Sequence, residues 1–268
     1  MRGDPTQFIG SIPDHYDRGM GPVIFAGPAA LAAKRVASLA PARVLETAAG
    51  TGIVTRALRD ALPPSATIVA TDLNGAMLDV SAKKFRPDES VTFQPADACA
   101  LAFADGAFDA VLCQFGVMFF PDKDKAYREA RRVLAPGGHY VFSVWDAMRH
   151  NPFSRVTTEV LHAAFAADPP PFLNTPVGYA AIDPVKASLL AAGFEGLRLD
   201  VIRMPGPVAD FSAFAGGLVR GSPLVDQIRA RGETPEKIER LVEAALRREF
   251  GAAGSVPLQF MLYEARRG

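Results

Sequence analysis

The chain has 268 residues, of which 49% are hydrophobic and 22% are charged, and its 29 Lys and Arg residues balance its 29 Asp and Glu residues. This length and composition are typical of a globular protein with a substantial core. The balanced charge provides no bulk attraction to nucleic acid or to a membrane surface, so we expect neither as a partner.

The N-terminal sequence, the apolar runs and the cysteines indicate the cellular compartment of the protein. The N-terminal sequence MRGDPTQFIGSIPDHYDRG lacks the apolar core of a secretory signal, and no run approaches the roughly 18 apolar residues of a membrane span. We therefore expect a cytoplasmic protein. Cys99 and Cys113 lie in different apolar segments without metal-ligand spacing, which predicts buried, reduced thiols and no metal site.

Strands and helices alternate through the first 145 residues, which is typical of a parallel sheet with helical crossovers. The strands are almost uniformly apolar, so we expect both faces of the sheet to be covered. The sequence APGG at 135–138 predicts an abrupt end to the helix before it. In chain order, the pattern predicts a helix over 28–39, a strand over 43–47, a helix over 53–62, a strand over 66–72, a helix over 75–85, strands over 90–94 and 108–113, a helix over 124–134 and a strand over 139–145.

The alternation breaks after residue 145. The rest of the chain predicts a helix and loops over 151–183, a helix over 184–194, a strand over 196–204, further helices over 207–250 and a strand over 256–267. No linker or repeat divides the sequence, so we predict a single domain over 1–268. Its parts are a helical N-terminal cover over 1–40, a cofactor-binding core over 41–145, and helical insertions over 146–183 and 205–254 that cover the substrate.

A glycine-rich turn follows the first strand. In VLETAAGTG, residues 44–52, Glu46 lies near the end of the strand, and Gly50 and Gly52 precede a helix. Glycine permits a close backbone approach to a ligand, and the free N–H groups of a helix N-terminus suit a carboxylate or phosphate. A purely structural turn would have the same sequence, so this motif alone leaves both interpretations open.

Two further acids follow the next strands. Asp72 ends the second strand, twenty residues after Gly52, where a carboxylate can accept both hydroxyls of a ribose. Helix capping is the alternative role for Asp72. After the third strand, in PADA, Asp97 can accept an adenine amino proton while Ala98 offers a backbone N–H.

Together these motifs resemble those of the class I S-adenosylmethionine-dependent methyltransferases, in their quinone-methyltransferase-like branch. The resemblance covers the first 145 residues, where the matching sequences are VLETAAGTG, TDLNGAML, ADACALAFADGAFDAVLCQFGVMFFPD and APGGHYVFSVWD. Four ordered motifs are harder to obtain by chance than one. The resemblance implies an α/β fold with a doubly wound, mostly parallel seven-stranded sheet and an antiparallel last strand. It also implies S-adenosylmethionine as cofactor and S-adenosylhomocysteine as product.

The resemblance also assigns cofactor contacts to individual residues. This chain departs from the family where it has Ala48 in place of Gly and Glu46 in place of Asp, and we expect Ala48 to cost little if its φ is negative. The implied contacts are Glu46, Ala48, Gly50 and Gly52 at the methionine end, Asp72 at the ribose, Leu73 and Met77 on the adenine face, Asp97 and Ala98 at the adenine edge, Gln114 near the transferring methyl, and Tyr16 in the N-terminal cover near the sulfonium.

Two other functions remain open. A dinucleotide-dependent oxidoreductase shares the strand, glycine turn and acid, although Thr55 stands where a third small residue is expected and no Tyr/Lys pair follows the fourth strand. A cofactor-binding protein without methyl transfer is the other alternative.

Methyl transfer from a sulfonium needs alignment and exclusion of water more than it needs a base. If a base is used, His150 after the fifth strand and then His15 are the candidates, with a structural role as the alternative for both. Aromatic residues in the insertions favour a small, apolar or aromatic acceptor that is methylated on oxygen or carbon. The sequence leaves open whether the protein is a monomer or a homodimer.

Overall fold

The computed structural model describes residues 6–268, and within them the chain forms a sheet of seven strands in the order β3-β2-β1-β4-β5-β7-β6. All neighbouring strands are parallel except that β7 runs antiparallel to both β5 and β6. The sequence-based fold class is therefore confirmed. The strands are β1 Arg43–Thr47, β2 Thr67–Asp72, β3 Val91–Pro95, β4 Phe108–Gln114, β5 Leu134–Trp145, β6 Phe194–Pro207 and β7 Ser255–Arg267.

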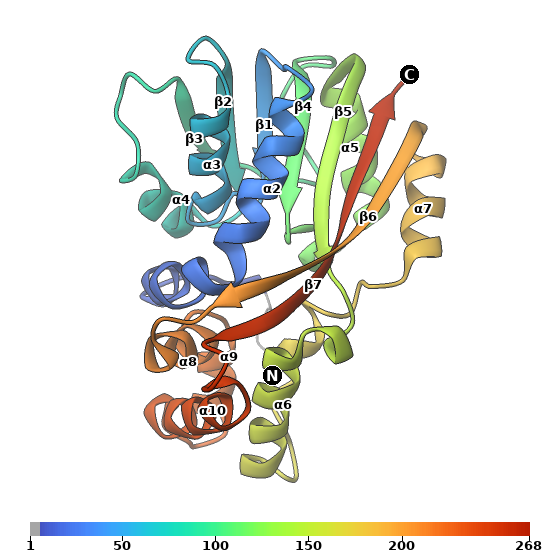
Figure 1. The fold of residues 1–268 in the computed structure, drawn as a ribbon. Helices are drawn as coiled ribbons and strands as arrows, with labels where there is room; N and C mark the ends of the chain where they lie inside the picture. Colours follow the sequence, from blue (N-terminus) through green and yellow to red (C-terminus); the bar gives the residue numbers. More distant parts are fainter. Residues whose placement is uncertain (1–5) are drawn as a thin grey trace.

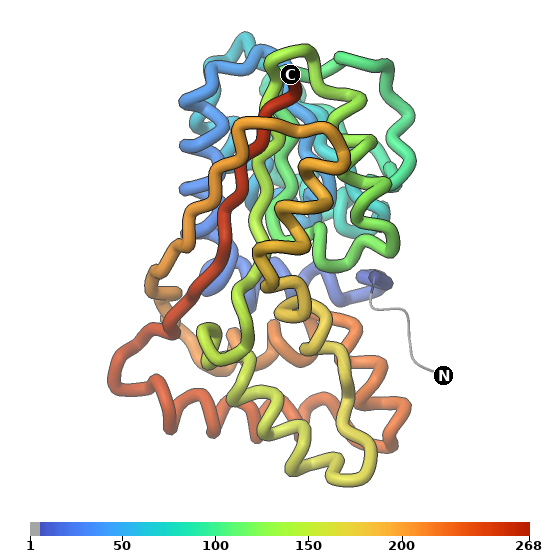
Figure 2. Tube along the Cα trace, turned by 90° about the vertical axis from the view of Figure 1, so that its right-hand side faces the viewer, coloured from blue at the N-terminus to red at the C-terminus, as the bar shows by residue number. Residues whose placement is uncertain are grey.

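Helices cover both faces of this sheet (Figures 1 and 2). One face carries α2 (Ala26–Ala37) and α3 (Ile53–Ala61), which contact each other, and the opposite face carries α5 (Lys123–Val133) and α7 (Ile182–Ala191). A shorter helix, α4 (Gly75–Ala82), packs against β2 and β3. The central strands are buried accordingly, with Val44 and Leu45 of β1 fully inaccessible to solvent.

A second, helical layer lies beyond the carboxyl ends of the parallel strands (Figure 1). Long strands β6 and β7 extend past the rest of the sheet to reach it. It contains α1 (Ile12–His15), a π-helix η1 (Tyr16–Phe25), α6 (Pro152–Ala164), α8 (Phe211–Arg220), α9 (Leu224–Arg229) and α10 (Pro235–Phe250). Short 3₁₀ turns, η2 (Val117–Phe119), η3 (Met148–His150) and η4 (Phe172–Asn174), complete the described elements.

The helix before APGG ends abruptly, as predicted, but the strand that follows it begins earlier than predicted. The helix ends at Val133 and the strand begins directly at Leu134, which pairs with Phe108, so APGG belongs to the strand and not to a turn. A register shift between Phe108 and Ala110, together with a φ of +77° at Gly137, accommodates this sequence in the sheet. A bulge absorbs the residues that local sequence rules assign to a break.

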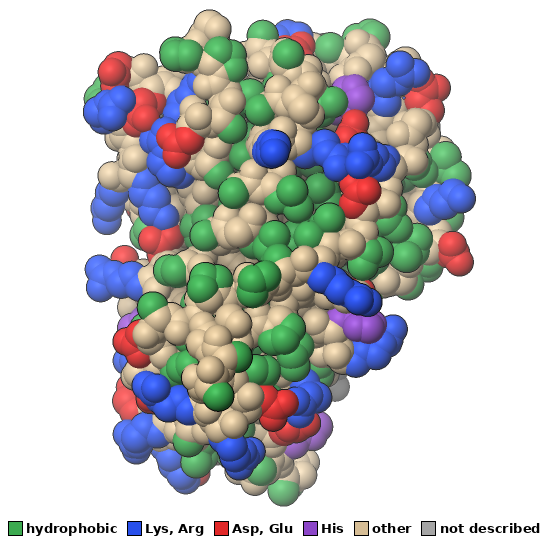
Figure 3. All heavy atoms as spheres, viewed as in Figure 1, with side chains coloured by type: hydrophobic (Ala, Val, Ile, Leu, Met, Phe, Trp, Pro, Cys, Tyr) green, Lys and Arg blue, Asp and Glu red, His purple; other side chains and the backbone are tan. Residues whose placement is uncertain are grey.

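The surface agrees with the balanced composition. Positive and negative side chains are interspersed over the face that Figure 3 shows. Both cysteines are free and buried. Among residues 6–268, no helix combines the length and the apolar character that crossing a membrane requires.

Candidate functional site

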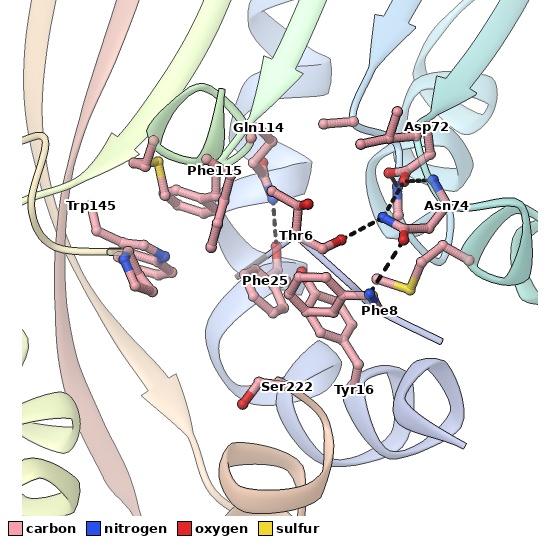
Figure 4. A pocket seen from close by; sticks show the side chains of 18 of the residues that line it. Thr6, Phe8, Tyr16, Phe25, Asp72, Asn74, Gln114, Phe115, Trp145 and Ser222 are labelled. Atoms are coloured by element: carbon pink, nitrogen blue, oxygen red, sulfur yellow. Dashed lines mark hydrogen bonds between the residues drawn. The ribbon is translucent and has the colours of Figure 1, made fainter. Parts of the chain in front are cut away.

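A large cavity lies between the sheet and the helical layer, at the carboxyl ends of β1, β2, β4 and β5 (Figure 4). It contains about 1310 Å³ of space free of protein atoms, part of which is open to solvent. Ligands of open α/β sheets bind at this edge, in the crevice beyond the strand ends. This cavity is therefore the candidate ligand site of the chain.

Left-handed backbone conformations shape the turn between β1 and α3. Gly50 has a φ of +56° and lines the cavity, as the close-approach interpretation requires. Ala48 also lines the cavity, and its φ is +53°, so the condition under which we expected Ala to cost little is not met. Left-handed backbone costs a residue with a Cβ roughly 1–2 kcal/mol, and this chain carries that strain at Ala48.

Gly52 has a different role from Gly50. It has a φ of +80° and does not line the cavity. A Cβ at Gly52 would collide with Ser81 of α4, lying 2.9 Å from its Cβ. This glycine therefore permits close packing of the turn against α4, and the sequence pattern alone does not separate such a packing glycine from a ligand-facing one.

Asp72 lies at the cavity edge and is only 7% exposed. Its Oδ2 accepts a hydrogen bond from the Gly50 N–H at 2.9 Å, and its Oδ1 accepts one from the Asn74 N–H at 2.8 Å. Burial raises the pKa of this carboxyl, whereas these backbone donors lower it. Oδ1 also lies 3.4 Å from Asn74 Nδ2, so the carboxylate is oriented and Oδ2 is the oxygen with a lone pair left for a ligand hydroxyl.

Glu46 is not at the cavity surface. It is 1% exposed and does not line the cavity, in contrast to the role at the methionine end that the motif implies. Burial raises its pKa to about 8, an effect that the neighbouring Thr55 hydroxyl offsets only in part. Its Oε2 has no hydrogen-bond partner within residues 6–268. The side chain therefore lies under the glycine turn in its neutral form at neutral pH.

The expected adenine contacts surround one end of the cavity. Leu73, 61% exposed, and buried Met77 line it, as do Asp97 and Ala98. The Asp97 side chain is exposed, and its Oδ1 accepts a hydrogen bond from the Cys99 N–H at 2.8 Å. Two apolar side chains and the loop after β3 thus form a slot suited to a planar base.

Gln114 and Tyr16 line the cavity and both contact Phe25. Gln114 Nε2 donates to the Phe25 carbonyl at 3.4 Å, whereas its buried Oε1 accepts no hydrogen bond in the described part of the chain. Tyr16 stacks on Phe25 with ring centroids 4.8 Å apart (Figure 4). An oriented, unpaired amide oxygen is suited to accept a hydrogen bond from a bound ligand, because a buried acceptor without a partner is costly.

Aromatic rings form the other half of the cavity. Phe115 and Trp145 stack with centroids 3.9 Å apart and an interplanar angle of 2°, and Phe153 meets Trp145 edge to face. Among the aromatic and leucine side chains of the insertions, Phe153, Phe172, Leu173 and Leu218 line the cavity. Phe165, Tyr179, Phe211 and Phe214 pack in the core around it.

Both histidine candidates lie outside this cavity. His150 is in the exposed turn η3, where its Nε2 accepts a hydrogen bond from Arg149 at 3.0 Å. His15 lines a separate small polar pocket with Arg220 and Glu239, and burial lowers its pKa. Neither imidazole is positioned to take a proton from a molecule in the large cavity, so the structure does not bring the base candidates to the site.

Sequence reasoning missed several residues that the fold brings to the cavity. Phe8, Asn74, Phe115, Trp145 and Ser222 line it and come from five separate segments. One of them carried a weak signal in the sequence, because Phe115 precedes a glycine at the end of an apolar strand. In the structure Phe115 has a φ of +54°. The others carry no local pattern, since only tertiary packing brings their segments together.

Residues 45–142 match the family described as "Methyltransferase domain". A demethylmenaquinone methyltransferase from Thermus thermophilus is 45% identical over 103 residues, which is 38% of this chain and 46% of that protein. The chain thus spans about half the length of the curated relatives it matches. The family match ends before α6, so most of the helical layer lies outside it.

Solved structures support the fold. The YcgJ protein from Bacillus subtilis superimposes with a TM-score of 0.58 at 19% identity, covering 90% of this chain and 98% of that one. A phosphoethanolamine N-methyltransferase 2 from Haemonchus contortus, solved with S-adenosylhomocysteine, gives a TM-score of 0.53 at 17% identity, covering 84% of this chain and 48% of that one. Fold, motifs and family match agree over residues 45–142, which match the methyltransferase domain and are similar there to demethylmenaquinone methyltransferases.

Proposed function

We propose that this protein transfers a methyl group from S-adenosylmethionine to a small, uncharged, apolar or aromatic molecule, on oxygen or carbon. The observation that carries the proposal is Asp72, held by the Gly50 N–H at the edge of the cavity beyond the strand ends. The named relative is a methyltransferase, and the Haemonchus neighbour was solved with S-adenosylhomocysteine. Hydride transfer from a dinucleotide has no comparable support.

The residues present fit the cofactor. Asp72 presents an oriented carboxylate to the ribose hydroxyls, Leu73 and Met77 flank the space for adenine, and the free Oε1 of Gln114 can accept a hydrogen bond from the amino-acid end. When bound, S-adenosylmethionine supplies a methyl group on a positively charged sulfur. The aromatic ring of Tyr16 provides a face that attracts such a charge.

The lining also limits the acceptor. Among residues 6–268, the cavity is lined by no Lys, Arg or His, and its two acids, Asp72 and Asp97, lie at the nucleoside end. A charged acceptor would lose its hydration without gaining a counter-ion, which is costly. The chain's role at the acceptor is therefore to align it against Phe115 and Trp145 and to limit the access of water, and the proton that the acceptor loses on methylation is released to bulk solvent.

Calorimetry with S-adenosylhomocysteine tests the proposal. We expect Asp72→Ala to weaken binding about 100-fold, because two charge-assisted hydrogen bonds to the ribose are lost. Asp79→Ala is the matched control, since Asp79 is an exposed acid on α4 outside the cavity, and it should bind as the wild type does.

Three results would contradict this function. They are no binding of S-adenosylhomocysteine, tighter binding of a nicotinamide dinucleotide, or equal affinity of the Asp72→Ala and wild-type proteins. A panel of phenols, quinones and amines then tests transfer itself. Binding of the cofactor without methylation of any uncharged member would favour a binding protein.

A further inference from the structure

The N-terminal segment lies across the cavity beside the nucleoside end. We call residues 6–10 the N-terminal strap. Thr6 and Phe8 line the cavity, and the Phe8 ring lies edge-on to Tyr16, Phe119 and Phe172 with centroid distances of 6.0, 6.2 and 6.5 Å. Phe8 thus joins aromatic rings from the π-helix η1, the 3₁₀ turn η2 and the 3₁₀ turn η4, and the strap completes the wall of the cavity.

The side chain of Asn74 holds this strap (Figure 4). Its Nδ2 donates to the Thr6 carbonyl at 3.0 Å, and its Oδ1 accepts from the Phe8 N–H at 3.3 Å. The same Phe8 N–H lies 3.2 Å from the Thr6 carbonyl, so the Asn74 amide bridges both ends of a tight turn.

Asn74 does not make the contact that its position favours. It is the N-cap residue of α4, where an Asn side chain usually accepts a hydrogen bond from its own helix, yet here it makes no such cap. The amide instead spans 68 residues of sequence to reach Thr6. Local helix stability therefore does not account for the orientation of this side chain.

The same residue also contacts the ribose-binding acid. The Asn74 N–H donates to Asp72 Oδ1 at 2.8 Å, and its Nδ2 lies 3.4 Å from that oxygen. Asn74 is thus in contact with Asp72 on one side and with the strap on the other. A movement of Asp72 or of the strap therefore shifts the Asn74 side chain and, through it, the other of the two.

We propose that Asn74 is a positioning residue that holds the N-terminal strap closed over the bound cofactor, so that release of the cofactor requires the strap to open. The proposal rests on the proposed function, since it takes the ligand at Asp72 to be a nucleoside. Closure keeps water from the aromatic half of the cavity and slows dissociation, as lids do in other enzymes.

Stopped-flow dissociation of S-adenosylhomocysteine from the full chain tests this role. Asn74→Ser removes both contacts to the strap but keeps a good N-cap residue for α4. We expect it to accelerate dissociation about ten-fold, consistent with two lost hydrogen bonds. Phe8→Ala should have a similar effect, and the double variant should exceed either single variant by far less than the product of the two, because both act through one strap.

Chymotrypsin provides a readout independent of the ligand. Cleavage after Phe8 requires the strap to leave the cavity, so Asn74→Ser should accelerate that cut in the ligand-free protein as well. Asn174→Ser, the same change at an exposed residue of η4, should leave both cleavage and dissociation as in the wild type. Unchanged dissociation or cleavage in Asn74→Ser, or fully multiplicative effects in the double variant, would overturn the proposal.

The two proposals fail in different ways. If the wild type does not bind S-adenosylhomocysteine, the proposed function fails, and with it the link between the strap and a nucleoside. Faster cleavage in Asn74→Ser would in that case still show that Asn74 holds the strap. Tight binding with dissociation that is insensitive to Asn74 leaves the proposed function intact and refutes the strap's role.

Discussion

At the scale of a single residue, Glu46 shows how burial sets the role of an acid. The carboxyl is buried under the glycine turn, and one of its oxygens has no partner in the described part of the chain. Burial raises its pKa from 4.5 to about 8, so the folded protein keeps the proton that the unfolded chain releases. Glu46 therefore affects the stability of the folded protein, and the size of this effect depends on pH.

A raised pKa contributes stability that is complete below about pH 4.5 and is lost as the pH rises through about 8. We therefore expect the free energy of unfolding of the wild type to fall, relative to that of Glu46→Gln, by a few kcal/mol between pH 5 and pH 8. Urea unfolding of both proteins across this range measures the difference. Parallel pH profiles would show that Glu46 ionises normally in the folded protein.

At the scale of elements, the π-helix η1 decides which of its side chains face the cavity. Tyr16 and Phe25 are nine residues apart, which is two and a half turns of an α-helix and would separate them to opposite sides. The wider i→i+5 winding, seen in the bond from the Ala26 N–H to the Gly21 carbonyl, turns both rings to one side. Their stacking over the cavity depends on this unusual helix.

The position of η1 depends on its contact with α8. A Cβ at Gly19 would lie 2.6 Å from the Gly217 Cα and still closer to the Ala213 carbonyl, and backbone atoms cannot give way as a side chain tip can. We expect Gly19→Ala to destabilise the protein by about 1–3 kcal/mol and to weaken cofactor binding by displacing Tyr16.

Denaturant unfolding and calorimetry measure the two effects of Gly19→Ala. Gly75→Ala is the control, because a Cβ at Gly75 meets no atom within 4 Å and Ala favours the helix α4. This control should be neutral or slightly stabilising. Equal stability of the two variants would mean that η1 and α8 are not in close contact in solution.

At the scale of the whole molecule, the cavity joins the sheet to the helical layer. Asp72 and Gln114 come from strand ends, whereas Phe172, Leu218 and Ser222 come from the layer beyond them. A ligand that touches both parts stabilises the folded protein against the unfolded chain, because the unfolded chain lacks the assembled site.

S-adenosylhomocysteine at about 100 times its Kd should therefore add about 2.7 kcal/mol of stability and raise the Tm by about 5–10 °C. Differential scanning calorimetry measures this shift. The Asp72→Ala protein at the same ligand concentration serves as the control and should show little change. A constant Tm in the wild type under saturating ligand would argue against binding to the native state.

The sequence by itself determined the sheet and its nucleoside end. Apolar strands alternating with amphipathic helices predict a parallel sheet, because each pattern depends on residues a few positions apart. Asp72 and Gly50 could be placed for the same reason, since Asp72 ends the second strand and Gly50 lies in the turn after the first, and both strand ends are set locally. Both lie where that reasoning placed them, at the carboxyl edge of the sheet.

Only the tertiary structure decided the rest of the site. The left-handed φ of Ala48, the burial of Glu46 away from the cavity and the distant contacts of Asn74 depend on packing between segments far apart in sequence. His15 and His150, the base candidates from the sequence, lie outside the cavity, whereas Phe8 and Trp145 line it. Local periodicity fixes which face of an element is buried, but the neighbour on that face is set by how all elements pack together.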